Sequence, residues 1–356
     1  MENLVTQHKF WHKKNVLITG HTGFKGGWLS LWLDKIGAKV SGYALKPTKE
    51  NEFYNLVYAN GFVGPELFAD INNLKKLSEF IKKQNPSVIF HLAAQPLVRK
   101  SYLDPLETFM TNSMGVVTLL EAIRNSGLEP TLLNITTDKV YKIKDRNLAF
   151  KENDQLGGND PYSASKSCSE LITHSYKNSY FQETAVKIAT VRAGNVIGGG
   201  DMSKDRLIPD YLRSLLNDKP MTLRNPKATR PWQHVLEPIS GYITLAEKLS
   251  HQNGNKYEGS WNFGPTKSIY EVGEIINKLC KISGGKKFKT FENPNLLETQ
   301  SLILNSSKAM NKLNWKPKLK IDDALSLTFN WFSKSLNQHD MQKFSLQQIL
   351  DYQSNA

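Results

Sequence analysis

Cysteine is scarce in this sequence: Cys168 and Cys280 are the only two among 356 residues. They lie far apart and form neither a C-x-x-C pair nor a metal-binding spacing with histidine, so we expect no disulfide framework and no bound metal. Long apolar runs are also missing, and none approaches the roughly eighteen residues that a membrane span requires. Residues 1–15 lack the apolar core of a secretory signal. We therefore expect a cytoplasmic protein without a membrane segment.

Acidic residues are outnumbered, since 46 Lys and Arg against 33 Asp and Glu give a net charge of +13. A basic surface attracts phosphates and raises the question of nucleic acid binding. The lysines are dispersed, however, in short groups such as Lys82-Lys83 and Lys286-Lys287, without a long basic run or an aromatic platform. We expect no nucleic acid partner, and we interpret the charge as a solvated surface or as an attraction for a small anionic substrate.

The start of the chain has the pattern of a βαβ unit. A short apolar strand at 15–19 is followed by a glycine-rich turn, an apolar helix over 28–36 and a second strand at 39–44. The alternation then continues, with strands at 67–69, 87–90 and 132–135 and helices at 74–83 and 107–125. Strands that alternate with helices predict a parallel sheet with right-handed crossovers.

The alternation becomes less regular after about residue 190. We therefore expect an α/β protein, with a Rossmann-type doubly wound parallel sheet and a smaller mixed α/β C-terminal substrate lobe. The expected division is a dinucleotide-binding domain over 1–190, with a returning segment near 232–265, and a substrate-binding lobe over 191–356.

Gly20, Gly23 and Gly26 give the spacing G-x-x-G-x-x-G between the first strand and the first helix. This spacing lets the backbone approach a pyrophosphate at the N-terminus of the helix. The acidic residue expected about twenty positions later, which would bind the adenosine ribose, is missing. The sequence therefore predicts a dinucleotide site without choosing between NAD and NADP.

Two further motifs carry side chains suited to proton transfer. Tyr162 and Lys166 form Y-x-x-x-K at the start of a predicted helix, where residues four apart share a face and a cation can stabilise the phenolate. Thr137, Asp138 and Lys139 follow the apolar run at 132–135. By itself, that second motif is more typical of solvated charges at the end of a strand.

Together these motifs resemble the extended short-chain dehydrogenase/reductases, and within them the nucleotide-sugar 4,6-dehydratases, above all the branch that acts on CDP-glucose. The resemblance covers nearly the whole chain. The matching stretches are HTGFKGGWLSLWL, HLAAQPLVRKSY, TTDKVY, YSASK, VRAGNVIGGGD, DRLIPD, RNPKATRPWQHVLEP and SSKAMNKLNWKPKLKIDDAL.

The resemblance implies a reaction in three stages. Tyr162 takes the proton of the sugar 4-hydroxyl while C4 gives hydride to the nicotinamide, and Lys166 binds the nicotinamide ribose. Water then leaves across C5 and C6, with Asp138 as the acid for the C6 hydroxyl and Thr137 bonding the 4-oxygen. Hydride finally returns to C6. An ordinary dehydrogenase needs no second acid/base set, whereas a dehydratase does.

Lys139 departs from the dTDP-glucose branch, which has glutamate at this position as the base for the C5 proton. An amine acts as that base only if burial or a neighbouring cation lowers its pKa. Otherwise Lys139 orients Asp138 or stabilises an enolate, and the sequence leaves these alternatives open.

The resemblance also implies NAD as cofactor, a nucleotide-sugar substrate, a homodimer or homotetramer, and a role in making O-antigen or another surface glycan. The implied cofactor-binding residues are Gly20, Gly23, Phe24, Lys25, Gly26, Asp70, Ile71, Leu92, Ala93, Ala94, Asn112, Tyr162 and Lys166. The implied substrate-binding residues are Gln95, Asn195, Arg206, Leu207, Arg230 and His234.

Three alternatives remain at this point. A nucleotide-sugar 4-epimerase shares the glycine turn and Y-x-x-x-K but does not need Asp138 and Lys139. A 4,6-dehydratase acting on another nucleotide sugar would share every motif. A regulatory protein that only binds the cofactor would not need the full proton-transfer set.

Overall fold

A seven-stranded parallel sheet forms the centre of the larger part of the molecule, in a computed structural model that describes residues 9–143, 149–223, 225–265, 269–285, 288–290, 302–337 and 339–354. The strand order is β10-β6-β5-β4-β1-β2-β3. The strands are β1 (Asn15–Thr19), β2 (Lys39–Ala44), β3 (Glu66–Phe68), β4 (Val88–His91), β5 (Thr131–Ile135), β6 (Lys187–Ala193) and β10 (Gly259–Phe263). The strand order reverses between β1 and β4, and this arrangement confirms the predicted doubly wound sheet. In an open α/β sheet, the point at which the strand order reverses leaves a ligand-binding crevice at the carboxyl ends of the two strands, here β1 and β4.

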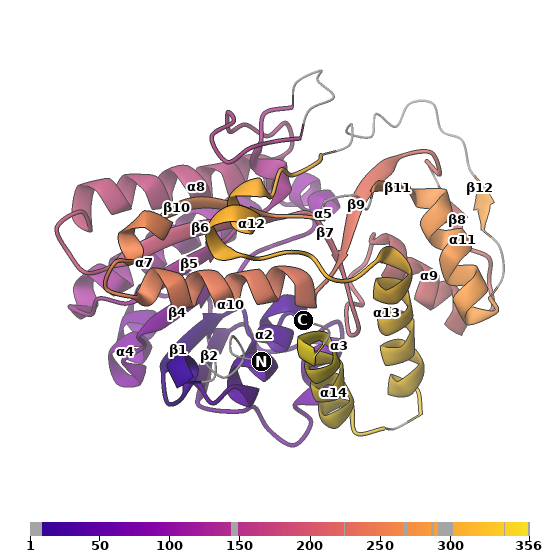
Figure 1. The fold of residues 1–356 in the computed structure, drawn as a ribbon, viewed down its shortest axis with the longest axis horizontal. Helices are drawn as coiled ribbons and strands as arrows, with labels where there is room; N and C mark the ends of the chain where they lie inside the picture. Colours follow the sequence, from indigo (N-terminus) through magenta and orange to yellow (C-terminus); the bar gives the residue numbers. More distant parts are fainter. Residues whose placement is uncertain are drawn as a thin grey trace.

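Helices cover both faces of this sheet because its strands are apolar on both sides. In β1, Val16 and Ile18 pack into one buried cluster and Leu17 into the other. Figure 1 shows α10 lying across one face, with α4 and α7 at the far left. The helices of this part are α2 (Phe24–Lys35), α3 (Glu52–Val57), α4 (Leu74–Gln84), α5 (Val98–Leu103), α6 (Pro105–Phe109), α7 (Gly115–Ser126), α8 (Pro161–Tyr180) and α10 (Leu236–Ser250).

One predicted helix is interrupted. The sequence pattern predicts a continuous helix over 107–125, whereas the structure has α6, a π-helical turn η1 (Met110–Met114) and then α7. Asn112 lies in this turn with its side chain buried. Such turns insert one residue into a helix and are frequent at functional sites.

A smaller lobe lies at the right of Figure 1 and contains two small sheets, of order β11-β9-β7 and β12-β8. Its strands are β7 (Asn195–Ile197), β8 (Thr222–Leu223), β9 (Thr229–His234), β11 (Ile269–Glu271) and β12 (Lys289–Thr290). They share an apolar cluster with α9 (Leu207–Leu216), α11 (Val272–Ser283) and α13 (Ile321–Ser335). The chain also returns to the large sheet, since β10 joins it, α12 (Ser307–Leu313) contacts β10, and α14 (Met341–Ser354) contacts α2 and α3.

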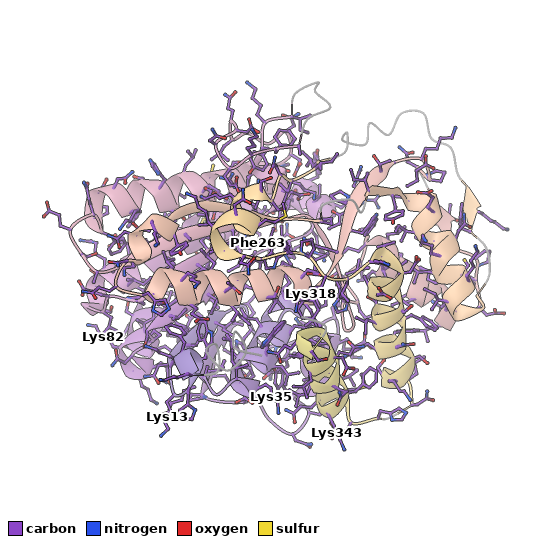
Figure 2. The ribbon with its side chains drawn as sticks, in the orientation of Figure 1. Lys13, Lys35, Lys82, Phe263, Lys318 and Lys343 are labelled. Atoms are coloured by element: carbon purple, nitrogen blue, oxygen red, sulfur yellow. The ribbon has the colours of Figure 1, made fainter. Side chains whose placement is uncertain are left out.

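The positive charge is spread over the surface. Figure 2 shows Lys13, Lys82 and Lys343 at well-separated points along the margin of the molecule. Within the described ranges, the helices lack the combination of length and hydrophobicity needed to cross a membrane.

Candidate active site

The glycine turn between β1 and α2 brings backbone close to backbone. A Cβ atom on Gly20, whose φ is +75°, would lie 2.7 Å from the Ala93 nitrogen, and one on Gly26 would lie 2.2 Å from the Gly20 oxygen. Both positions therefore require glycine. Gly23 precedes α2 and offers no side-chain cap to its first N–H groups. These N–H groups and the positive end of the helix dipole suit a phosphate.

Two lysines add positive charge at this turn. Burial and neighbouring cations lower the pKa of Lys25 to about 8, and burial together with the charge of Lys25 lowers the pKa of Lys166 to about 8. Lys166 Nζ donates to the Ile135 carbonyl at 3.1 Å. A phosphate placed here would raise the pKa of both amines, because its negative charge stabilises their protonated forms. The residues present therefore fit a dinucleotide with an anionic pyrophosphate.

Asp138 lies at the centre of the turn after β5. Its Oδ1 atom accepts hydrogen bonds from the Thr137 hydroxyl at 2.9 Å and from Lys139 Nζ at 3.1 Å. The side chain of Asp138 is 2% exposed and that of Lys139 is 31% exposed. The three residues thus form one acid–amine–hydroxyl group at the carboxyl end of the sheet.

Tyr162 reaches this group from the first turn of α8. The Thr137 hydroxyl and the positive charges of Lys139 and Arg206 lower the pKa of the phenol, and the charge of Asp138 raises it. Its pKa lies above the ordinary value because burial outweighs the two cations. The sequence suggested Lys166 as the neighbouring cation, but Lys139 is the one with the largest effect on the phenol. Lys166 lies one turn further along α8, and its amine donates to the Ile135 carbonyl at the end of β5.

The smaller lobe closes the other side of the group. A Cβ on Gly194 would lie 3.4 Å from both Asp138 Oδ2 and Pro231 Cγ, so Asp138 and the start of β9 meet across this glycine. The charge of Arg206 lowers the pKa of both Lys25 and Tyr162. Its NH1 forms an ion pair with Asp201 at 2.9 Å. Arg230 precedes Pro231 on β9. Arg206 and Arg230 are thus carried by segments of the smaller lobe near the turn that holds Asp138.

Two predicted ligand-binding residues have their side chains engaged within the protein. The Gln95 amide bonds the Leu97 backbone and Thr108. The Asn112 amide accepts from Gln95 N at 2.8 Å and donates to Gln95 O and Ser165 Oγ. Both are buried. These bonds fix the loop after β4 against α8, so this structure assigns both side chains a role in shaping the site.

His234 is completely buried. Its ring lies edge-on to Trp28, with centroids 6.3 Å apart, and burial lowers its pKa to about 3. This geometry gives His234 no path to a ligand in the cleft. The other predicted residues lie at strand or helix ends: between β1 and α2 (Phe24), after β3 (Asp70, Ile71), after β4 (Leu92, Ala93, Ala94), at the start of β7 (Asn195) and at the start of α9 (Leu207).

The sequence did not reveal a buried ion pair behind the turn after β5, Glu170 on α8 with Arg192 on β6. It also missed Ser101, whose hydroxyl accepts from the Tyr162 backbone nitrogen at 3.1 Å. One signal was present: Glu170 follows Lys166 by one helical turn and so shares its face. For metals, a search of the described residues finds no cluster of three or more His, Cys, Asp or Glu side chains that could bind an ion.

A dinucleotide crevice with the Tyr162–Lys166 pair on a sheet of this order defines an extended short-chain dehydrogenase/reductase. Comparison with known proteins narrows the class. The profile of the GDP-mannose 4,6-dehydratase family matches residues 17–328, and the chain belongs to this family.

The chain is 43% identical to CDP-glucose 4,6-dehydratase of Salmonella typhimurium over 352 residues, which cover 97% of this chain and 98% of the relative. It resembles the structure of dTDP-glucose 4,6-dehydratase from Streptomyces venezuelae with NAD bound, at 20% identity and a TM-score of 0.77, over 90% of this chain and 97% of the other. UDP-glucuronic acid 4-epimerase of Bacillus cereus, solved with NAD and UDP-glucuronic acid, matches at 25% identity and a TM-score of 0.77, over 90% and 99%.

Proposed function

We propose that this protein is a CDP-glucose 4,6-dehydratase, an NAD-dependent hydro-lyase that converts CDP-D-glucose to CDP-4-keto-6-deoxy-D-glucose. The observation that carries the reaction type is the placement of Asp138 and Lys139 beside Tyr162 and Thr137. The choice of CDP-glucose rests on the identity of 43% along nearly the full length of the Salmonella enzyme.

NAD, when bound, supplies the hydride acceptor and donor for the reaction. The Gly20–Gly26 turn and the first N–H groups of α2 would hold its pyrophosphate. Lys25 adds a positive charge beside that turn. Lys166 lies one helical turn beyond Tyr162, where we assign it to the nicotinamide ribose.

Proton transfer is divided between two groups in this proposal. Tyr162 takes the proton of the 4-hydroxyl, helped by the nearby Thr137 hydroxyl and by the charge of Lys139. The 4-keto group then acidifies C5, and Asp138 gives a proton to the departing C6 hydroxyl. Lys139 is partly exposed and paired with the Asp138 carboxyl, which, of the roles considered for it, favours a cation that stabilises the enolate over a base for the C5 proton.

The diphosphate of the substrate is assigned to Arg206 and Arg230, because a guanidinium group binds phosphate oxygens through two parallel hydrogen bonds. We assign NAD binding to residues 1–190 with the returning segment 232–265, and nucleotide-sugar binding to 191–356. We propose that the reaction takes place in the cytoplasm, where NAD and nucleotide sugars are both available.

We further propose that the protein works as a homodimer or homotetramer. Large apolar side chains are exposed on neighbouring elements on the α8 side of the sheet, namely Tyr102, Leu103, Leu106, Met110, Met114 and Leu171. A contiguous apolar patch of this kind is typical of a protein–protein interface. Light scattering of the purified protein would test this assignment.

The test of the function is mass spectrometry after incubation with NAD and, separately, CDP-glucose, dTDP-glucose, UDP-glucose and GDP-mannose. We expect the loss of one water from CDP-glucose alone. Loss of water from another sugar would keep the reaction and change the nucleotide. No change of mass with any sugar would contradict the dehydratase proposal. Chromatography of the same samples would then detect an epimerised product of unchanged mass.

A further inference from the structure

Glu170 and Arg192 form an ion pair that is almost completely buried behind the catalytic turn, with side chains 3% and 2% exposed. Arg192 Nε donates to Glu170 Oε1 at 2.8 Å and NH2 donates to Oε2 at 2.9 Å. Removing two charges from water is costly, and apolar residues in such places are often as stabilising. Stability alone therefore does not account for the pair.

The pair holds both ends of one short segment. Thr136 donates to Glu170 Oε1 at 2.6 Å, and Arg192 NH1 donates to the Tyr141 hydroxyl at 2.7 Å. Between these two contacts lie Thr137, Asp138 and Lys139. The residues assigned to proton transfer are thus bracketed by bonds to a single buried pair.

The same pair is connected to the groups on either side of the turn. Glu170 lies two helical turns beyond Tyr162 on α8, so it moves with the phenol. Arg192 lies two residues before Gly194, against which Asp138 Oδ2 packs.

The guanidinium group of Arg192 has no donor to spare. NH1 also donates to the Glu152 carbonyl at 2.9 Å, and NH2 also donates to Ser260 Oγ at 2.9 Å. With the two bonds to Glu170 and the one to Tyr141, all five N–H groups are used. The group therefore cannot turn without breaking bonds.

We propose that Glu170 and Arg192 are positioning residues that clamp segment 136–141 and thereby set the position of the Asp138 carboxyl relative to the Tyr162 phenol. Neither side chain is assigned to the substrate or to the cofactor. The inference rests on the proposed function for its effect on proton transfer, whereas the clamp itself is a property of the free protein.

Two threonines provide a matched test. Thr136 and Thr190 are 4% and 5% exposed, and each donates to one Glu170 oxygen at 2.6 Å. Thr136 belongs to the clamped segment, whereas Thr190 lies on the neighbouring strand β6, outside the segment. Thr136→Val and Thr190→Val each remove one bond to Glu170, but only the first removes a side-chain bond made by the segment itself; the backbone N–H of residue 136 still donates to the Val191 carbonyl at 2.8 Å.

Amide hydrogen exchange of the peptide covering 136–141 measures the clamp without substrate. We expect exchange about tenfold faster in Thr136→Val, because one hydrogen bond is worth roughly that factor, and unchanged exchange in Thr190→Val. Tyr141→Phe, which frees the other end, is expected to resemble Thr136→Val. Equal exchange in the two threonine variants would overturn the proposal.

Steady-state kinetics of the two threonine variants then measure the effect of the clamp on the reaction. We expect Thr136→Val to lower kcat about tenfold with KM unchanged, and Thr190→Val to leave both within about twofold. Equal kcat in the two variants would overturn the positioning role. If the unaltered protein removes water from no sugar, the proposed function fails, and the exchange experiment still decides whether the clamp exists.

Discussion

The two sides of the cleft are held together in different ways. On the side of the large sheet, the ion pair Glu170–Arg192 is almost fully buried and every donor of the guanidinium group is used. On the side of the smaller lobe, Arg206 is one-third exposed in its pair with Asp201. The pair between Arg99 and Asp205, which joins the two sides, is about half exposed.

The difference in burial between the two sides fits the different functions that we propose for them. Proton transfer requires fixed distances, which buried and fully bonded groups provide. Phosphate binding tolerates more movement, and partly exposed arginines such as Arg206 have room to adjust. Relatives named for UDP-glucuronate and dTDP-glucose share the fold at 20 to 25% identity. We infer that the buried side holds the chemistry and that the lobe adapts to the nucleotide.

The largest expected effect separates the two proton-transfer groups on the buried side. Tyr162→Phe should lower C4 oxidation and water loss by about 10³-fold or more, because the base is gone. Asp138→Asn should abolish water loss but still allow C4 oxidation. Cofactor reduction, followed by absorbance at 340 nm on mixing with substrate, checks this. Equal loss of reduction in both variants would refute the division of roles.

The next effect compares a buried with an exposed ion pair. Arg192→Met should lower the free energy of unfolding by about 3–5 kcal/mol, because it leaves the Glu170 carboxylate buried without its partner. Lys278→Met, which breaks an exposed pair with Asp322 in the smaller lobe, should change it by no more than about 0.5 kcal/mol. Urea denaturation of both variants measures the two values. Similar losses of unfolding free energy in the two variants would contradict the expected difference between the buried and the exposed ion pair.

A smaller effect concerns the substrate phosphate. Arg206→Met should raise KM for the nucleotide sugar by about 100-fold, because a charge-assisted phosphate contact is lost, and Arg206→Lys should recover part of it. Arg99→Met is the control, since its exposed pair predicts a KM within about twofold. Steady-state kinetics give both values. An unchanged KM in Arg206→Met would exclude this arginine from the phosphate site.

The smallest expected effect is a pH dependence of NAD binding. Lys25 and Lys166 have a pKa of about 8 in the free protein, lowered mainly by burial. The pyrophosphate favours their charged forms, so binding takes up protons and affinity falls as pH rises above about 8. We expect a loss of about tenfold between about pH 7.5 and pH 9.5, measured by tryptophan fluorescence.

Lys25→Arg is the matched variant for this measurement, because its charge does not titrate in this range. It should reduce the pH dependence and leave only the contribution of Lys166. An unaltered slope would show that Lys25 does not face the pyrophosphate.

Local patterns in the sequence account for most of the sheet and for the position of the turn. The bounds of β1 and β2 match the predicted strands, because β1 is a short apolar run that ends at Gly20 and β2 begins just after Gly37, which ends the preceding helical segment. The π-helical turn at Met110–Met114 was not predicted, since the hydrophobic pattern of 107–125 fits an ordinary helix and the insertion arises from packing.

The candidate site was predictable only where a residue type matches a position in the motif. The Glu170–Arg192 pair was not, because its partners are 22 positions apart and each resembles an ordinary surface charge until the fold buries it. Likewise, the sequence could suggest a cation beside Tyr162, but only the structure assigns the larger effect to Lys139. Burial and the partners of Gln95, Asn112 and His234 depend on the tertiary fold.

The proposed role of Asp138 and Lys139 is to serve an elimination of water across C5 and C6. Elimination removes the C5 proton, and C5 must then take a proton from the solvent. We would therefore run the reaction with CDP-glucose in D₂O and examine the product by mass spectrometry and NMR. We predict a product that has lost one water and carries deuterium at C5. A product of unchanged mass, or one that has lost water without deuterium at C5, would contradict it.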